Sequence, residues 1–414
     1  MDLNSTPSAE RTHIGFFGMR NAGKSSVVNK FTGQQLAVVS DTKGTTTDPV
    51  YKAMELLPVG PVMIVDTPGF DDEGELGELR VKKTKEVLRK VDVAVLVVDG
   101  TVGLTECDKR VIQLFGQRKI PFVIAVNKLD LYEESEYNIF ASSKEIKYNE
   151  QSSLKELNSN NIVSISAITG EGIDDLKQKV IEKCNVDKKE HYIVSDLVKE
   201  KDIVILVVPI DSAAPKGRII LPQQQTIRDL LDGGAITMVC TPDNLKLTID
   251  AVDKKVALVI TDSQAFKEVD KIVPKDIKLT SFSILMARYK GFLDTALEGT
   301  KAIDGVKDGD RILICEGCTH HRQCEDIGTV KIPNWLTKYT GKELKIDTCS
   351  GREYPEDLRG YALVIHCGAC MLNEREVISR MNIAIDQNVP FTNYGIVIAK
   401  MNGILDRATE IFYN

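Results

Sequence analysis

No stretch of the sequence says more about the fold than residues 18–25, which read Gly18-Met19-Arg20-Asn21-Ala22-Gly23-Lys24-Ser25. They follow the apolar run HIGFFG and open a helical pattern, which is the layout of a phosphate-binding loop between a strand and a helix. Glycines let the backbone wrap closely around phosphates, and the free N–H groups at the helix start bind negative charge. We therefore expect Lys24 to reach the β- and γ-phosphates of a nucleotide and Ser25 to bind magnesium.

The residues around this loop alternate between short apolar runs and amphipathic segments. The runs VMIVD, VAVLVVDG, FVIAVNK and IVSIS are typical of buried strands, and residues 79–91 and 109–117 have helical patterns. Such alternation predicts an α/β fold with a mostly parallel sheet. Residues 51–57 and 62–66 flank a Pro-Val-Gly turn, which adds one antiparallel hairpin and makes the sheet mixed.

Two motifs after the loop are suited to magnesium and the γ-phosphate. Asp66 ends an apolar run, where it would bind magnesium through water, and Gly69 would donate its N–H to the γ-phosphate. Thr46 lies between the phosphate-binding loop and Asp66, and its hydroxyl would complete the magnesium shell and make this intervening loop sensitive to the nucleotide. We expect Lys24, Thr46, Asp66 and Gly69 to act together on the phosphates, with Ser25 and Thr46 on magnesium.

Two later motifs select guanine. Asn127-Lys128-Leu129-Asp130 follows an apolar run, and the Asp130 carboxylate can accept both N–H groups that guanine offers. Ser166-Ala167 would supply a backbone N–H to the guanine carbonyl. A buried carboxylate left unpaired discriminates strongly against the wrong base. The expected GTP-binding residues are Gly18, Asn21, Ala22, Gly23, Lys24, Ser25, Ser26, Asp66, Gly69, Asn127, Lys128, Asp130, Ser166 and Ala167.

Cysteines concentrate in the last third of the chain. Six of the nine lie between residues 315 and 370, within the groups Cys315-x-x-Cys318 and His366-Cys367-x-x-Cys370 and at positions 324 and 349. The two groups follow the apolar runs RILI and ALVI, so they would converge at strand ends if these strands are neighbours. The spacing leaves three alternatives open: tetrahedral zinc, an iron–sulfur cluster on three thiolates, or buried thiols without a metal.

The remaining pattern suggests two further α/β segments. A middle segment contains strand candidates at 203–210, 236–240 and 256–260 and a helix candidate at 223–231. The last segment contains the helices 282–297, 334–340, 373–386 and 396–412 and the strands 311–315, 361–365 and 389–393. We place domain boundaries after residues 11, 187 and 272, with 1–11 a flexible tail, 12–187 and 188–272 two domains, and 273–414 the last.

Composition narrows the class of protein. The 414 residues are 43% hydrophobic and 27% charged with a net charge of −7, which argues against a chain-wide nucleic-acid surface. No apolar run is long enough to span a membrane, and the polar N-terminus lacks the apolar core of a signal peptide. An odd number of cysteines without an export signal argues against a disulfide framework. We expect a cytoplasmic protein without a membrane partner.

The five nucleotide motifs resemble those of the small GTPases related to TrmE and Era, over roughly residues 12–185. Asn21 matches the position where potassium-activated members carry an asparagine, so the resemblance implies that Asn21 helps to bind K⁺ beside the phosphates. Phe70 follows Gly69 where Ras-like proteins carry a glutamine that positions water. A phenyl ring cannot orient water, and we expect slow GTP hydrolysis that depends on potassium, since a cation can replace an arginine finger electrostatically.

The whole chain resembles the FeFe-hydrogenase maturation GTPases of the HydF family. The resemblance is carried by Cys318-x-His320, 45 intervening residues and His366-Cys367-x-x-Cys370, together with the N-terminal GTPase motifs. It implies a 4Fe-4S cluster on Cys318, Cys367 and Cys370, a homodimer formed through 188–272, and a scaffold that binds and hydrolyses GTP. The cargo would be the diiron precursor of the hydrogenase H-cluster, and the partners would be two radical-SAM maturases and apo FeFe-hydrogenase.

Three questions stay open at this level. His320 and His366 are either a fourth iron ligand or hydrogen-bond donors to the cluster, and we favour the second. Cys315, Cys324 and Cys349 lie outside the family motif and are expected to be small buried residues, although Cys315 could supply a fourth thiolate. The alternative function is an RNA- or ribosome-associated GTPase with a structural zinc domain. The near-neutral last segment counts against it.

Overall fold

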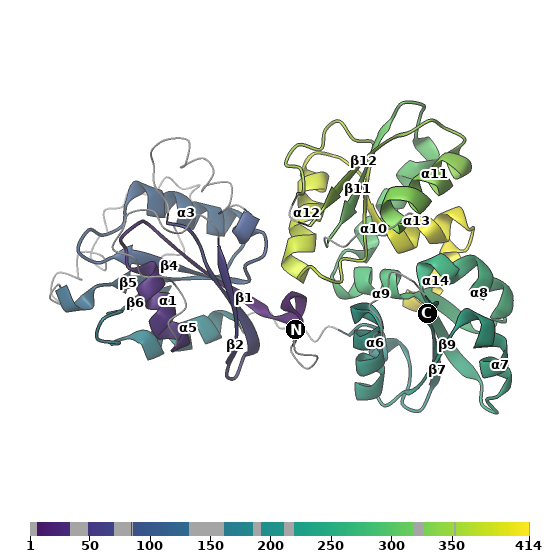
Figure 1. Ribbon diagram of the computed structural model, residues 1–414, viewed down its shortest axis with the longest axis horizontal. Coiled ribbons are helices and arrows are strands. Elements are labelled where there is room, and N and C mark those ends of the chain that lie inside the picture. Colours follow the sequence, from purple (N-terminus) through teal and green to yellow (C-terminus); the bar gives the residue numbers. More distant parts are fainter. Residues whose placement is uncertain are drawn as a thin grey trace. The chain divides into compact units, whose positions relative to one another are not determined.

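The computed structural model describes residues 6–33, 49–69, 84, 86–131, 161–184, 192–210, 219–317, 326–351 and 353–413. The chain forms two compact units, residues 1–189 and 190–414 (Figure 1). Each unit is built around mostly parallel β-sheet structure with helices on both faces. Within the described ranges, none of the helices has the length and apolar character needed to cross a bilayer.

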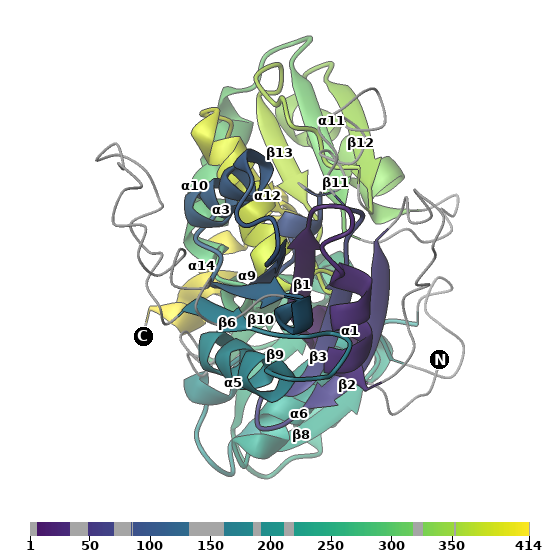
Figure 2. The ribbon, with the colours of Figure 1, turned by 90° about the vertical axis from the view of Figure 1, so that its left-hand side faces the viewer.

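The first unit contains one six-stranded sheet in the order β2-β3-β1-β4-β5-β6. Only β2 runs antiparallel to its neighbour; the other pairs are parallel, which confirms the predicted mixed α/β sheet with one hairpin. Figure 2 shows β2 and β3 toward one edge and β6 at the other. The elements are β1 (Thr12–Gly18), α1 (Lys24–Thr32), β2 (Val50–Leu56), β3 (Gly60–Asp66), β4 (Val93–Asp99), α3 (Glu106–Gln117), β5 (Phe122–Asn127), β6 (Ile162–Ser164) and α5 (Ile173–Cys184).

Both faces of this sheet are covered, so its strands are apolar on both sides, as parallel strands usually are. On one face α1 and α5 pack through Phe31 and Leu176 on Phe16 and Val95. On the other face α3 packs on Phe17, Leu96 and their neighbours. Figure 1 shows α3 on the opposite side of the sheet from α1 and α5. This packing fixes the carboxyl ends of β1, β3, β5 and β6 at one edge, where the nucleotide motifs follow.

The second unit contains two four-stranded parallel sheets, β10-β9-β7-β8 and β12-β11-β13-β14. The first part consists of β7 (Ile203–Val207), α6 (Leu221–Asp232), β8 (Ile236–Cys240), α7 (Leu245–Asp250), β9 (Val256–Thr261), α8 (Phe266–Ile272), β10 (Lys278–Ser281) and α9 (Phe282–Tyr289). The second part consists of α10 (Leu293–Thr300), β11 (Arg311–Glu316), α11 (Ile332–Thr340), β12 (Lys345–Ser350), β13 (Leu363–His366), α12 (Glu374–Asp386), β14 (Phe391–Asn393), α13 (Tyr394–Met401) and α14 (Leu405–Thr409).

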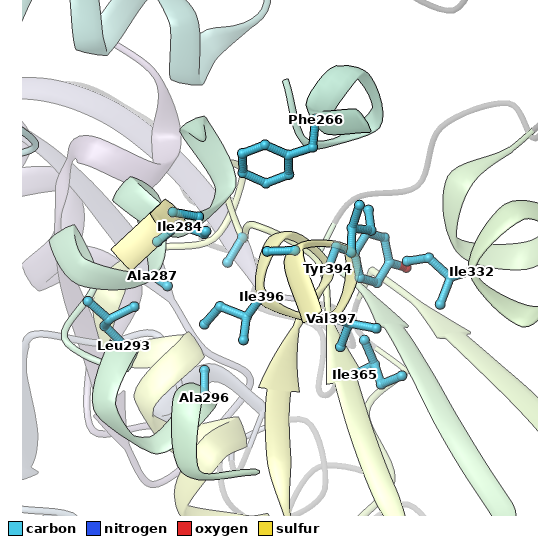
Figure 3. Packing of buried hydrophobic residues seen from close by; sticks show 14 of the residues in the cluster. Phe266, Ile284, Ala287, Leu293, Ala296, Ile332, Ile365, Tyr394, Ile396 and Val397 are labelled. Atoms are coloured by element: carbon cyan, nitrogen blue, oxygen red, sulfur yellow. The ribbon is translucent and has the colours of Figure 1, made fainter. Parts of the chain in front are cut away.

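One continuous core joins the two sheets of this unit. Helix α13 lies in its middle, and its residues from Tyr394 to Ala399 are all buried. Figure 3 shows Ile396 and Val397 of this helix among residues of α8, α9, α10 and β13. A helix that is apolar on every side belongs inside a domain. Burial of helix α13 therefore fixes the position of Tyr394, its first residue.

The structure differs from the predicted elements at a few places. Two predicted helices, 282–297 and 396–412, are each broken in two, because Gly291 and Gly403 adopt left-handed φ values of 72° and 70° that end a helix. Strand β12 was not predicted, since it is a half-exposed edge strand without an apolar run. Strand β10 lies beyond residue 272 but pairs with β9. The domain boundaries themselves stay predictions.

Candidate functional site

The phosphate-binding loop joins β1 to α1 through a close turn. Gly23 caps the helix with a left-handed φ of 80°, and a Cβ atom built there would stand 2.3 Å from Asn127 Nδ2. A Cβ at Gly18 would stand 2.4 Å from the carbonyl oxygen of Val97. Only glycine fits at these two positions, which leaves the loop N–H groups and the α1 N-terminus to face a phosphate.

Three side chains converge on the carboxyl end of β3. The ammonium group of Lys24 contacts Asp66 Oδ1, and Ser25 Oγ donates to Asp66 Oδ2 over 3.0 Å. Lys24 is only 8% exposed and Asp66 only 3%. These groups are the ones that phosphate and magnesium need, and a bound Mg²⁺-nucleotide would redirect the same charges onto phosphate oxygens and the metal.

Gly69 places the end of the Asp66 motif against the phosphate-binding loop. A Cβ at Gly69 would lie 3.2 Å from both Cα and N of Arg20, so the backbones approach closely. Thr67 Oγ1 donates to the Phe16 carbonyl over 2.7 Å and anchors this segment to β1. Thr46 and Phe70, which are expected to act at the γ-phosphate, lie outside the described residues.

The guanine motifs are joined to the loop by hydrogen bonds. Asn127 Nδ2 donates to the Ala22 carbonyl over 2.9 Å, and Asn127 Oδ1 accepts from the Ala167 N–H over 3.0 Å. Ser166 Oγ donates to Asp130 Oδ1 over 2.6 Å. These contacts bring Asn127, Asp130 and the 166–167 turn to one edge of the sheet, within reach of a base whose phosphates sit on α1.

Sequence reasoning missed Asp99, which ends β4 and pairs with Lys128 over 2.5 Å. Burial works against ionisation of Asp99, but the hydrogen bonds from Lys128 and Thr101 outweigh it and keep the pKa of Asp99 below its usual value. Lys128 itself adopts a left-handed φ of 72°. The signal was present in the sequence, because Asp99 follows the apolar run VAVLVV, as Asp66 follows VMIV.

The second candidate site lies at the carboxyl edge of the last sheet. Strands β11 and β13 are neighbours, with Cys315 opposite His366, which is the condition under which the sequence predicts that the two cysteine groups converge. Cys367 Sγ accepts hydrogen bonds from the N–H groups of Gly317 at 3.1 Å and Ala369 at 3.4 Å. Burial raises the pKa of Cys370. Cys318, which follows Gly317, and His320 lie outside the described residues.

Within the described ranges, no three metal-binding side chains form a group. The described cysteines nevertheless fit a metal-bound sulfur, because two backbone N–H groups already point at Cys367 Sγ and would stabilise a thiolate there. Gly317, the residue immediately before Cys318, also lies next to Cys367. The donor set is compatible with a soft metal or an iron–sulfur cluster.

Cys315 pairs with a second buried thiol. Its buried Sγ lies 3.1 Å from Cys349 Sγ on the neighbouring strand β12, where the two residues are directly paired. Burial raises the pKa of Cys315 well above its usual value, which keeps it a thiol. The pairing accords with the expectation that Cys315 and Cys349 are small buried residues.

His366 is fully buried, and both ring nitrogens have partners. Nε2 lies 3.3 Å from Arg380 Nη1 and Nδ1 lies 3.0 Å from the Cys367 carbonyl oxygen. Arginine can only donate, so Nε2 accepts and Nδ1 carries the proton that it donates to the carbonyl. Burial and then Arg380 lower the pKa of His366 to about 3, so the ring is neutral. His366 thereby orients the backbone of Cys367.

Arg380 is a further residue that sequence reasoning missed. It is 1% exposed, and its Nη2 donates to Glu376 Oε1 over 2.7 Å and to the Gly351 carbonyl over 2.5 Å. A buried guanidinium needs such partners, because an unpaired charge in the interior is costly. The i,i+4 spacing of Glu376 and Arg380 on a predicted helix was the available signal.

Tyr394 carries a buried hydroxyl that has no hydrogen-bond partner among the described residues. A Cβ built at Gly328 would stand 2.3 Å from this oxygen and 2.7 Å from Glu316 Oε1, so both oxygens face the same glycine. Burial, and then the nearby Cys367 and Glu316, raise the pKa of Tyr394 well above its usual value. The phenol therefore keeps its proton and is a donor.

Family models match three segments of the chain. Residues 13–128 match the 50S ribosome-binding GTPase model, residues 193–291 the hydrogen maturase F dimerization domain, and residues 294–411 the hydrogen maturase F tetramerization domain. The chain therefore contains a GTPase domain followed by two domains found in hydrogen maturase F. The last match contains the edge of the sheet at which Cys367 and Cys370 lie.

Curated relatives match the N-terminal part. GTPase Der of Clostridium kluyveri is 32% identical over 187 residues, which are 44% of this chain and 39% of the relative. The tRNA modification GTPase MnmE of Clostridioides difficile is 32% identical over 39% of this chain and 32% of the relative. The chain thus spans about two fifths or less of the length of these relatives. Among solved structures, Aquifex aeolicus Era bound to GDP and AlF4⁻ covers 55% of this chain and 93% of its own, at 18% identity and a TM-score of 0.36.

Proposed function

Because this chain belongs to the hydrogen maturase F family, we propose that it is a GTPase scaffold that carries the diiron precursor of the hydrogenase H-cluster to apo FeFe-hydrogenase. One observation supports this most: a single chain combines a guanine-selective phosphate site with a strand edge where Cys367 lies beside Gly317, the residue before Cys318. A ribosome-associated GTPase with a structural zinc domain would not need the hydrogen maturase F segments that fill residues 193–411.

GTP hydrolysis is assigned to the first unit. Lys24 neutralises charge on the β- and γ-phosphates, Ser25 and Thr46 bind magnesium, and Asp66 binds it through water. Gly69 donates its N–H to the γ-phosphate, and Asn21 binds the potassium ion that assists. Positioning and electrostatics supply most of the catalysis in phosphoryl transfer, so the absence of an obvious general base among the motif residues is no obstacle.

The cluster site is assigned to Cys318, Cys367 and Cys370. When bound there, a 4Fe-4S cluster supplies one iron with a position open to an exchangeable ligand. The chain's own residues shape this site: Gly317 and Ala369 donate to Cys367 Sγ, and His366 fixes the Cys367 carbonyl. His366 serves in this arrangement as a positioning residue, since Arg380 and Cys367 occupy both ring nitrogens.

The proposed homodimer forms through the middle segment. Strand β8 is the edge strand of its sheet, and the Ile236 and Val239 side chains on it are 45% and 50% exposed. An edge strand with exposed apolar residues favours pairing with a second chain. The names of the matched models, dimerization and tetramerization, support an assembly of identical chains. The two radical-SAM maturases and apo FeFe-hydrogenase are the proposed partners, and the cytoplasm the proposed location.

The test separates the two sites in an anaerobic activation assay with apo FeFe-hydrogenase and both maturases. Cys318→Ser should keep GTP turnover and reduce hydrogenase activation to background. Lys24→Ala should lower GTP turnover about 100-fold, because it removes charge stabilisation of the transition state, and should keep the cluster. Normal activation by Cys318→Ser would show that the cluster has no part in delivery.

A further inference from the structure

The Tyr394 hydroxyl needs an explanation that packing does not give. The side chain is 8% exposed and its ring belongs to the shared core, but its oxygen has no hydrogen-bond partner among the described residues. A buried hydroxyl without a partner destabilises a protein, and phenylalanine would fill the same space without that cost. A buried hydroxyl without a protein partner therefore suggests that it donates a hydrogen bond to a ligand.

The fold places Tyr394 at the edge of the sheet where the cysteines lie. Strands β11, β13 and β14 are consecutive neighbours, and Cys315, His366 and Asn393 stand side by side in their register. Tyr394 follows the end of β14 as Cys367 follows the end of β13. The Asn393 side chain caps α13 by accepting from the Ile396 N–H over 2.9 Å, which fixes the first turn and the Tyr394 ring with it.

The Tyr394 oxygen is packed against Gly328. Both Tyr394 Oη and Glu316 Oε1 face Gly328, where any Cβ would come within 2.3 Å and 2.7 Å of them. Only glycine fits at this position, because the two oxygens already occupy the space that a Cβ would take. Glu316 precedes Gly317, whose N–H donates to Cys367 Sγ, and Cys367, the thiol that we assign to the cluster, lies close enough to Tyr394 to act on the phenol electrostatically.

We propose that Tyr394 donates a hydrogen bond to the iron–sulfur cluster bound through Cys367 and so sets its reduction potential. The inference rests on the proposed function, because it requires a cluster at this site. A donor to cluster sulfur stabilises the more negative, reduced state and raises the potential. Tyr394 is thus a cluster-contacting residue outside the cysteine motif.

The experiment compares the anaerobically reconstituted full-length protein with its Tyr394→Phe variant. Tyr354→Phe is the matched control, because the Tyr354 hydroxyl is also buried but donates to the Arg380 carbonyl over 3.0 Å. Four quantities are measured, the first three of which are the iron and sulfide content, the potential from an EPR-monitored titration, and the exchangeable-proton coupling in ENDOR spectra recorded in H2O and D2O. Thermal unfolding of each cluster-free protein is the fourth.

Tyr394→Phe should bind iron and sulfide as the wild type does, shift the potential to a more negative value, and lose one exchangeable-proton coupling. Its cluster-free melting temperature should be equal or higher, because no protein hydrogen bond is lost. Tyr354→Phe should melt at a lower temperature and keep the wild-type potential. Gly328→Ala, which pushes the hydroxyl from its place without removing it, should also shift the potential.

The proposal is overturned if Tyr394→Phe and Gly328→Ala both keep the wild-type potential and coupling, because the hydroxyl then has its partner elsewhere. Failure of the proposed function looks different, since the wild-type protein itself would then contain no iron and sulfide.

Discussion

Single residues connect separate motifs in both sites. Asn127 bonds to the phosphate-binding loop with one atom of its amide and to the 166–167 turn with the other, so it aligns the base and phosphate ends of the GTP site. His366 does the same in the last sheet, where it bonds to Arg380 and to the Cys367 carbonyl. Each residue is buried and has a hydrogen-bond partner at both polar atoms of its side chain, which fixes its orientation before any ligand binds.

The prediction at the scale of single residues concerns Asn21. It lies at the turn of the phosphate-binding loop with a left-handed φ of 63°. Asn21→Ala should lower GTP turnover in potassium by about tenfold or more, because it removes an oxygen ligand from the cation that offsets transition-state charge. Turnover in sodium should hardly change. Steady-state phosphate release in matched KCl and NaCl buffers measures both, and equal wild-type rates in the two salts would contradict potassium activation.

Residues in fixed motifs could be predicted from the sequence, whereas their supporting residues could not. The spacing around Lys24, Asp66 and Asp130 follows from the geometry of a nucleotide, so the chain alone reveals it. Arg380 and Tyr394 act through contacts with β11 and β13, and only the order of the strands brings them there. The sequence does not single out Tyr394, because nothing local separates a paired hydroxyl from an orphaned one.

At the scale of elements, the edge strand β12 is a strand that the sequence did not reveal. Strand β12 pairs Cys349 with Cys315 and so places a second thiol beside Cys315, but its half-exposed polar pattern gave no strand signal. The parallel strands inside each sheet were evident, because burial on both faces requires long apolar runs. Breaks in predicted helices at Gly291 and Gly403 were readable as left-handed glycines only once the packing was known.

The prediction at the scale of elements concerns strand β8. Val239→Lys should halve the mass of the assembly in solution, because a charge on an edge strand opposes pairing with a second chain. Val239 is half exposed, so the fold itself should change in stability by no more than about 0.5 kcal/mol. Light scattering after size-exclusion chromatography measures the mass, with Val239→Thr as the control that should stay assembled. An unchanged mass for Val239→Lys would place the dimer contact elsewhere.

At the scale of the whole molecule, the chain places its two chemistries in separate compact units. Residues 1–189 hold the GTP motifs and residues 190–414 hold the cysteine motif, so each site is completed by its own sheet. This separation is why the activation assay can remove one function and keep the other. GTP would then act on delivery by changing the loops around Thr46 and Asp66, as γ-phosphate does in other GTPases.

The central claim is a three-cysteine 4Fe-4S cluster in a GTPase scaffold. The most direct measurement is anaerobic analysis of iron, sulfide and zinc with an EPR spectrum of the dithionite-reduced protein, for the wild type and Cys315→Ala. Because Cys315 is paired with Cys349, the account predicts a 4Fe-4S signal and equal iron and sulfide in both proteins. Zinc without sulfide in the wild type, or a cluster that disappears in Cys315→Ala, would contradict it.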